Sequence, residues 1–242
     1  MDEREYTYSL TSEGNDLNEF DYLKPYGYQR LYGAMAEEHS KKMGFDFPST
    51  MKYGLGWVLI SLTLEIERPV KGSVRLEATT WHSGKKGPFY RREFVFKDGE
   101  GVTFKGCTYS ALINLKDRKV FSGTEVPFLK VPALENHVVS AAPLFKPHAE
   151  LELFERRKVY NSYIDFLGHV NNLRYSEFAY DALNEEEKKG FCGPCRIEMY
   201  FRSEIKPSDE FEVYKGYSDG AVIIKGTVGE EDSFYSVFRF EK

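Results

Sequence analysis

Apolar and polar side chains alternate along many stretches of this chain, a pattern typical of β-strands with one buried face. In the clearest case, residues 57–69, apolar side chains alternate with serine, threonine and glutamate. Those apolar positions are Val58, Ile60, Leu62, Leu64 and Ile66. With turn signals between the runs, the same pattern predicts further strands in the first half of the chain. They cover residues 6–11, 73–81, 89–97 and 102–115.

Two other stretches have apolar side chains at helical spacing. The first helix is predicted to run from Pro25, a residue favoured at the first helical position, to about Met43. One face of it carries Tyr28, Leu31, Met35 and His39. The second is predicted to follow Gly168 and to continue to about Leu183. Asp165 and Gly168 are expected at its start, where free backbone N–H groups stabilise anions and polarised carbonyl oxygens.

The order of these elements occurs twice. The second half contains predicted strands at residues 157–163, 196–205, 210–217, 221–228 and 233–240. Each half is therefore one short strand, one helix and about four strands, which indicates a tandem duplication. Between the halves, residues 127–147 contain four prolines and little periodicity, as in a connector. We expect an N-terminal repeat at residues 1–130, a connector at 131–150 and a C-terminal repeat at 151–242.

The composition limits the class of protein. The 242 residues are 41% hydrophobic with a formal net charge of −5, as in a soluble globular protein and not in a general nucleic-acid binder. No apolar run approaches the ~20 residues of a membrane span. The acidic start, residues 1–5, resembles neither a signal peptide nor a transit peptide, so we expect a cytoplasmic protein.

The chain has three cysteines, and this odd number is unlike a disulfide framework. Residues 192–195, Cys-Gly-Pro-Cys, form the tetrapeptide of thioredoxins, in which the motif opens a helix. Here it follows a charged run and precedes a predicted strand, so we interpret it as a turn with two reduced thiols. No second pair of ligands occurs at zinc spacing. We expect neither a metal nor a cofactor.

Four blocks of sequence resemble one known family. In the first half they are residues 56–69, Gly-Trp-Val-Leu through Glu-Ile-Glu-Arg-Pro, and residues 80–84, Thr-Trp-His-Ser-Gly. In the second half they are Asp-x-x-x-His-Val-Asn-Asn-x-x-Tyr at residues 165–175 and Phe-Arg-Ser-Glu-Ile at 201–205. Together they resemble the acyl-ACP thioesterases over nearly the whole chain. The expected fold is α+β, a tandem (double) hotdog in which each long antiparallel sheet wraps around one central helix.

The resemblance implies that the chain hydrolyses fatty acyl-ACP thioesters to free fatty acid and carrier thiol. It implies Asp165, His169 and Glu204 as catalytic residues, with Glu204 as the general base that activates water. His169 would orient water or protonate the departing thiolate, because imidazole titrates near neutrality. Asp165 fits two compatible roles, a helix N-cap and a carboxylate that aligns His169. Direct attack by water and an acyl-enzyme path through a carboxylate both fit these residues.

Leu167 departs from the family pattern, which usually has Asn at this position, and Leu cannot hydrogen-bond a water or a carbonyl. Either Asn161, Asn171 or Asn172 supplies that amide, or backbone N–H groups near residues 168–170 suffice, or activity is weakened. Two alternatives to acyl-ACP hydrolysis therefore remain. One is an acyl-CoA or aryl-CoA thioesterase, and the other is a catalytically impaired hotdog protein that binds acyl carriers.

Substrate contacts are expected in two places. The thioester would lie against Gly168, Val170, Asn171 and Asn172 at the second helix. The N-terminal repeat would line an acyl-chain tunnel, because Pro25 occupies the position aligned with His169 and has no reactive side chain. The candidate contacts there are Trp57 and, on the first helix, Tyr28, Leu31, Tyr32 and Met35. For each of these helix residues, simple core packing is the rival interpretation.

Two basic clusters, residues 85–86 with 91–92 and residues 156–158, stand out on an acidic protein. They would steer the acidic acyl carrier protein, the expected partner, although most charge runs are only solvated surface. Coenzyme A is also anionic, so charge does not separate the two carriers. Since two hotdogs in one chain already form the usual pair, we expect a monomer or a homodimer.

Overall fold

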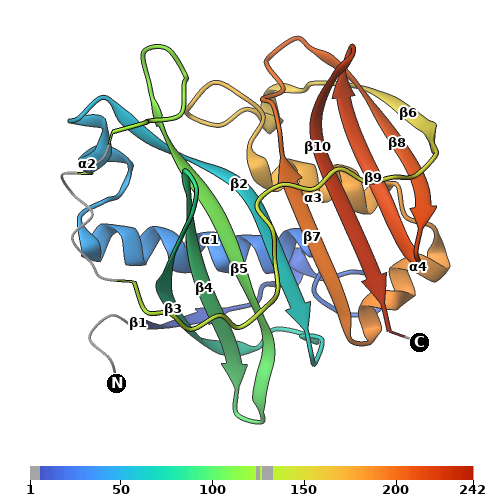
Figure 1. Cartoon of the computed structure of the whole chain (residues 1–242). Helices are drawn as coiled ribbons and strands as arrows, with labels where there is room; N and C mark the ends of the chain where they lie inside the picture. Colours follow the sequence, from blue (N-terminus) through green and yellow to red (C-terminus); the bar gives the residue numbers. More distant parts are fainter. Residues whose placement is uncertain (1–5, 124–125, 127–132, 242) are drawn as a thin grey trace.

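The computed structural model describes residues 6–123, 126 and 133–241 (Figure 1). The strands of the first half are β1 (Tyr6–Thr11), β2 (Leu55–Ile66), β3 (Arg75–Lys86), β4 (Phe89–Asp98) and β5 (Gly101–Asn114). Those of the second half are β6 (Leu151–Lys158), β7 (Cys195–Phe201), β8 (Glu210–Ser218), β9 (Ala221–Val228) and β10 (Glu231–Phe240). The helices are α1 (Pro25–Met43), α2 (Phe47–Met51), α3 (Asn172–Asp181) and α4 (Glu185–Lys189). Short 3₁₀ turns are η1 (Gly14–Asp16), η2 (Asn161–Tyr163) and η3 (Gly190–Cys192).

These strands form one antiparallel sheet in the order β1-β3-β4-β5-β2-β7-β10-β9-β8-β6. The two halves meet where β2 pairs with β7, from Ser61 opposite Tyr200 to Ile66 opposite Cys195. Each half has the predicted order of one short strand, one long helix and four strands. The bounds of α1 agree with those predicted, because Pro25 starts this helix and Gly44, at φ 73°, ends it in the left-handed conformation.

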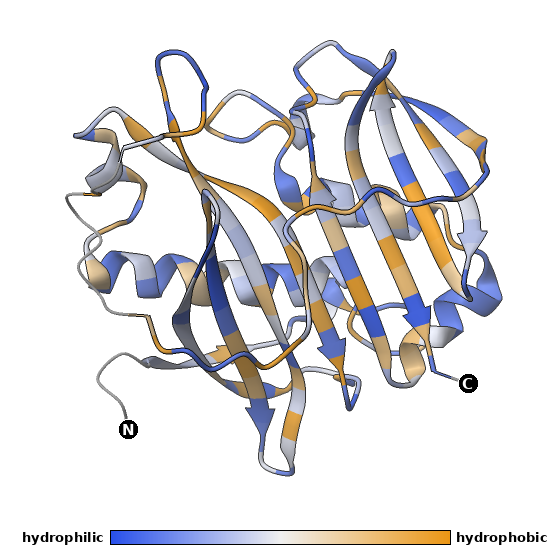
Figure 2. Ribbon diagram, in the orientation of Figure 1, coloured by the Kyte–Doolittle hydropathy of each residue, from blue (hydrophilic) through white to orange (hydrophobic). Residues whose placement is uncertain are grey.

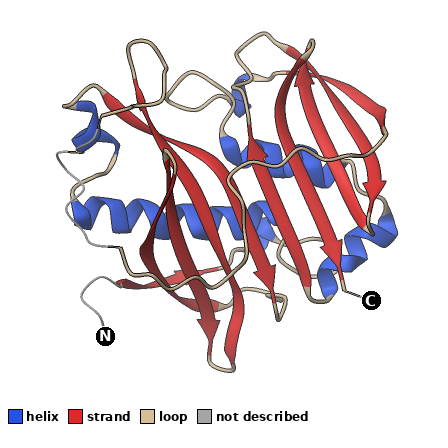
Figure 3. Ribbon diagram, viewed as in Figure 1, coloured by secondary structure: helices blue, strands red, loops and turns tan. Residues whose placement is uncertain are grey.

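The helices α1 and α3 lie together on one side of the sheet (Figures 1 and 3). The strands are banded in orange and blue in Figure 2, as the alternating pattern predicts. The side chains that face the helices form one continuous core, in which Tyr28 of α1 packs edge-on against Phe104 and Tyr175 of α3 stacks on Phe234. Gln29 also donates to the carbonyl of Asn172 at 3.3 Å, which joins the two helices near the start of α3.

Three predicted boundaries in the second half are wrong. The strand expected at residues 157–163 ends at Lys158, and η2 follows it. The helix expected after Gly168 begins at Asn172, because the Asn171 side chain accepts from the N–H of Leu173 at 2.9 Å and caps the helix there. The strand expected at residues 196–205 ends at Phe201, so Glu204 lies in the loop after β7.

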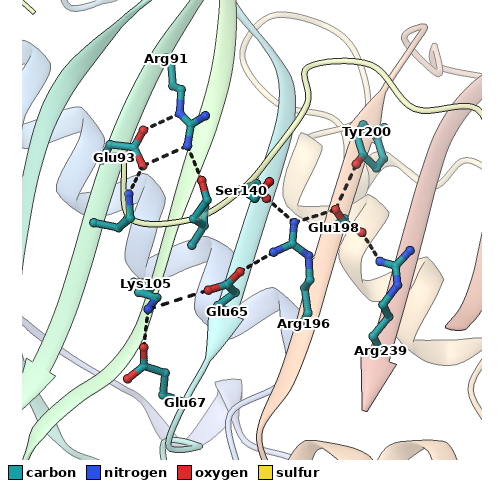
Figure 4. A network of polar contacts seen from close by, with 12 residues as sticks. Glu65, Glu67, Arg91, Glu93, Lys105, Ser140, Arg196, Glu198, Tyr200 and Arg239 are labelled. Carbon is teal, nitrogen blue, oxygen red and sulfur yellow. Dashed lines mark hydrogen bonds and ion pairs between the residues drawn. The ribbon is translucent and has the colours of Figure 1, made fainter. Parts of the chain in front are cut away.

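Residues 133–147 contain no helix or strand, as predicted for the connector, and residues 127–132 of that prediction lie outside the described residues. The connector crosses the sheet face opposite the helices and bonds to side chains of that face (Figure 4). Arg91 donates to the carbonyl of Val139 at 2.6 Å, and Glu93 accepts from the N–H of Val138 at 3.2 Å. Arg196 donates to the carbonyl of Ser140 at 2.5 Å. The outer face of the sheet thus fixes the connector through buried charges.

The arginines of the two basic clusters are buried or ion-paired, whereas Lys85 and Lys86 are exposed. Arg91 and Arg92 are buried, which contradicts their expected role in steering a carrier, and Arg91 forms an ion pair with Glu93. In the second cluster Arg156 pairs with Glu212 at 2.7 Å and Arg157 with Asp181 at 3.0 Å. The charges of Arg156 and Arg157 are therefore largely compensated, and a steering role for the exposed Lys85 and Lys86 stays a prediction.

Two smaller expectations can be compared with the structure. The cysteines 107, 192 and 195 are free, and the Cys-Gly-Pro-Cys segment leads from η3 into β7, which confirms a turn before a strand. Within the described ranges, no helix is both long enough and apolar enough to cross a membrane.

Candidate active site

The segment between Ile164 and Val170 is a tight hairpin loop and not the start of a helix. Ile164 and Val170 form an antiparallel bridge, and the N–H of Asp165 donates to the carbonyl of His169 at 3.0 Å. Gly168 lies at φ 82°, the left-handed conformation that such a three-residue loop requires and that glycine adopts readily. The Asp165 side chain accepts from the N–H of Leu167 at 2.9 Å. Asp165 therefore caps this loop, and its predicted role as N-cap of the helix is wrong.

His169 lies between two carboxylates. Its Nδ1 is 3.8 Å from Oδ2 of Asp165, and its Nε2 is 3.7 Å from Oε1 of Glu204. Both distances exceed a direct hydrogen bond but keep each carboxylate within ion-pair range of the imidazole. Nδ1 is also 3.2 Å from the carbonyl of Val170, and the side chain is only 13% exposed. The structure therefore brings the three predicted catalytic residues together.

Glu204 reaches this site because the segment after β7 is bonded to the hairpin loop and to α3. The N–H of Val170 donates to the carbonyl of Ile205 at 2.9 Å, and the N–H of Ile205 donates to the Tyr175 hydroxyl at 3.1 Å. Burial raises the pKa of Tyr175 to about 12, so its phenol stays neutral at physiological pH. These bonds fix the backbone next to Glu204 and hence the position of its side chain.

Arg118 is a site residue that no sequence motif indicated. It lies in the loop after β5 in the first half of the chain and forms an ion pair with Glu204. Because the side chains are 46% and 36% exposed, the pair contributes little to stability, on the order of 0–1 kcal/mol. Its effect is on the orientation of the Glu204 side chain. The separation of 86 residues left no local pattern to detect.

A cavity of about 320 Å³ lies in the first half of the molecule, next to the hairpin loop. Trp57 and Asn172, both predicted substrate contacts, line it. The ring of Phe166 in the hairpin loop packs edge-on against Phe47 of the cavity wall, with 5.4 Å between ring centroids. This contact joins the hairpin loop to the cavity wall, although Asp165, His169 and Glu204 are not among the residues that line the cavity. Tyr28, Leu31 and Met35 are buried in the core and do not belong to the wall of this cavity, which favours their core-packing interpretation.

Comparison with known families agrees with the fold. The acyl-ACP thioesterase N-terminal domain model matches residues 7–125, and the acyl-ACP thioesterase C-terminal domain model matches residues 148–236. The chain belongs to the acyl-ACP thioesterase family. It is accordingly a thioester hydrolase that acts on fatty acyl-ACP, and its fold is the predicted double hotdog.

Solved structures of this fold resemble the chain along its whole length. An acyl-ACP thioesterase from Bacteroides thetaiotaomicron is 21% identical, with a TM-score of 0.82 and 98% of each chain covered. A 12:0-ACP thioesterase from Umbellularia californica is 14% identical, with a TM-score of 0.79 and coverage of 100% of this chain and 98% of that one. No curated protein is a significant sequence match.

Leu167, the departure from the thioesterase pattern, lies on the hairpin loop with an exposed side chain. Of the three asparagines that could replace the missing amide, Asn161 is exposed in η2, and Asn171 uses its side-chain oxygen to cap α3. Asn172 lines the cavity. Asn172 is therefore the amide best placed to meet a substrate carbonyl. The sequence did not distinguish among the three, because their separation depends on where α3 begins.

Of the substrate contacts expected at α3, Gly168 shapes the hairpin loop and Val170 is fully buried beside it. No group of three or more His, Cys, Asp or Glu side chains in the described part of the chain is placed to hold a metal ion.

Proposed function

We propose that this thioesterase hydrolyses its substrate at the site formed by Asp165, His169 and Glu204. The observation that supports the assignment is the position of His169 between two carboxylates, three residues before Asn172, which lines the cavity together with Trp57. In this proposal the C-terminal repeat, residues 151–242, supplies the catalytic side chains. The N-terminal repeat, residues 1–130, supplies the cavity for the acyl chain, and residues 131–150 connect them.

The proposed reaction begins with the thioester carbonyl near the first turn of α3. The N–H groups of Leu173 and Arg174 at that end are bonded to Asn171, so the proposed donor to the oxygen is the Asn172 side chain, which would stabilise the developing negative charge. Glu204 takes a proton from a water that attacks the carbonyl carbon. His169, which Asp165 orients, gives a proton to the sulfur as the carbon–sulfur bond breaks. The products are a free fatty acid and the carrier thiol.

The proposed carrier is acyl carrier protein, whose phosphopantetheine arm would enter beside Phe166 and the hairpin loop. Measuring the hydrolysis of acyl-ACP and acyl-CoA with the same acyl chain tests this choice. A higher kcat/KM for acyl-ACP supports it, and equal or higher values for acyl-CoA contradict it. The same comparison separates an acyl-CoA thioesterase from an acyl-ACP thioesterase without any assumption about the catalytic residues.

The catalytic assignment is tested by release of free thiol from a panel of acyl-ACPs, with unmodified protein, Glu204→Gln and His169→Gln. The matched controls are Glu212→Gln, which removes a surface carboxylate paired with Arg156, and His148→Gln, which removes an exposed imidazole. We expect turnover to collapse in the first two variants only, with unchanged thermal unfolding. Tight binding of acyl-ACP without turnover in the unmodified protein would instead identify an impaired carrier-binding protein.

A further inference from the structure

The cavity contains a buried positive charge that the hydrolytic reaction does not use. Arg92 of β4 is only 7% exposed and lines the cavity together with His82 of β3. Much of the remaining wall is apolar, with Phe45, Phe47, Trp57 and Leu59. A cavity for a plain hydrocarbon chain has no need of a guanidinium group, because a buried charge without a counter-charge is costly.

The groups that surround Arg92 are uncharged. Its Nη1 contacts Nδ1 of His39 and lies 3.4 Å from Oγ1 of Thr80, and its Nη2 lies 3.3 Å from Nε2 of His82. Burial, with the charge of Arg92 nearby, lowers the pKa of His39 to about 3 and that of His82 well below its usual range. Both imidazoles are therefore neutral at physiological pH. No ion pair between Arg92 and a carboxylate occurs within the described residues.

The two acidic residues of the cavity wall, Glu37 and Asp46, interact with Lys41 and not with Arg92. Glu37 pairs with Lys41 at 2.6 Å, and Asp46 also acts electrostatically on Lys41. The neighbouring arginine gives a useful contrast, since Arg91 points to the other face of the sheet and is paired with Glu93. Arg92 thus differs from Arg91 in lacking a counter-ion, although both are equally buried.

Arg92 and Asn172 line the cavity from different repeats. Asn172 belongs to the second repeat, which joins the first where β7 pairs with β2. Arg92 belongs to β4, which lies two strands from β2 in the sheet. At ~4.8 Å per strand this separates β2 from β4 by roughly 10 Å. A chain whose thioester lies near Asn172 would extend toward Arg92 and His82 with its distal end.

We propose that Arg92 and His82 recognise an oxygen function, foremost a carboxylate, at the distal end of the acyl chain. This inference rests on the proposed use of the cavity for the acyl group. A guanidinium has five N–H donors in a planar fork, more than its contacts with His39, Thr80 and His82 require, and it binds carboxylates strongly. A methyl end would leave those donors unpaired, and sites built to hydrogen-bond a polar group reject analogues that lack it.

The test uses acyl-ACPs of several chain lengths. At each length it compares acyl chains that end in a methyl, a hydroxyl or a carboxylate group. We expect the unmodified protein to hydrolyse an oxygen-ended chain at least tenfold better, by kcat/KM, than the methyl-ended chain of the same length. Arg92→Met should abolish or reverse this ratio, and Arg92→Lys should retain part of it. Arg156→Met, which removes an arginine from the surface, should leave the ratio unchanged. Preference for the methyl end at every length would overturn the inference.

A second measurement keeps the inference testable if Arg92→Met does not fold or if no acyl-ACP is hydrolysed. The thermal unfolding of the unmodified protein is compared in decanedioic acid and in decanoic acid. A larger rise of Tm with the diacid supports recognition at Arg92, and an equal rise overturns it. Absence of turnover with every substrate would refute the proposed function, while the diacid comparison would still decide the role of Arg92.

Discussion

The buried ion pair between Arg91 and Glu93 allows a quantitative test of how the sheet fixes the connector. Its side chains are 8% and 0% exposed, so neither charge is compensated by water. Glu93 also accepts from the hydroxyl of Ser83 at 2.6 Å and from the N–H of Val138 at 3.2 Å. Replacing Glu93→Leu keeps a similar volume but leaves Arg91 as an unpaired buried charge.

Removing one partner of a buried pair costs about 3–5 kcal/mol. A chain of this length loses about 2–4 °C of Tm per kcal/mol, so Tm should fall by roughly 6–20 °C. The double variant Arg91→Met, Glu93→Leu removes both charges. It still leaves the N–H of Val138 and the carbonyl of Val139 without these partners, at about 1–3 kcal/mol. We therefore expect the double variant to be more stable than Glu93→Leu alone.

The assay is urea unfolding of the unmodified protein, the two single variants and the double variant, followed by circular dichroism. Glu93→Gln, which removes only the charge, serves as the comparison. A double variant that loses as much free energy of unfolding as the sum of the two single variants would refute the reasoning. A loss below ~1 kcal/mol for Glu93→Leu would also refute it, since that is the range of exposed pairs.

The other predictions concern catalysis, pH and packing. Glu204→Gln and His169→Gln should each lower kcat by about 10²–10⁴, the usual contribution of a general acid or base, and a steady-state assay that finds less than a tenfold loss contradicts the assignment. The pKa of His39 is lowered to about 3 from its ordinary 6.5, so the unfolded chain binds more protons between these values. Stability should then be fully present above pH 6.5 and fall with decreasing pH, by up to ~1.4 kcal/mol per pH unit for this group, and His39→Gln should flatten the slope in urea titrations. Gly106→Ala would place a Cβ 2.2 Å from the carbonyl of Thr63, so Tm should fall clearly, and an unchanged Tm would show that β5 and β2 can separate there without cost.

Much of the fold was predictable because its determinants are local in the sequence. Pro25 and Gly44 define the ends of α1 through backbone conformation, and alternating side chains define the strands through burial of one face. The double hotdog followed from the repeated order of these elements and from the family resemblance. The start of the second helix was misplaced by three residues, since Asp165 and Asn171 are both good capping residues and only the pairing of residues 164 and 170 decides between them.

The sequence by itself determined the elements, their duplicated order and the three residues that meet at the proposed catalytic site. Only the tertiary structure decided how those residues meet. Glu204 lies beside His169 because the N–H of Val170 and the side-chain hydroxyl of Tyr175 bond to the backbone of Ile205 in the loop after β7. Arg118 joins Glu204 from the other repeat. Tertiary structure also decided that Arg92 is buried in a cavity, although the sequence suggested surface charge. The spacing of residues in the sequence predicts on which face of its helix or strand a residue lies. Its burial and ion pairing depend on what the rest of the chain packs against that face.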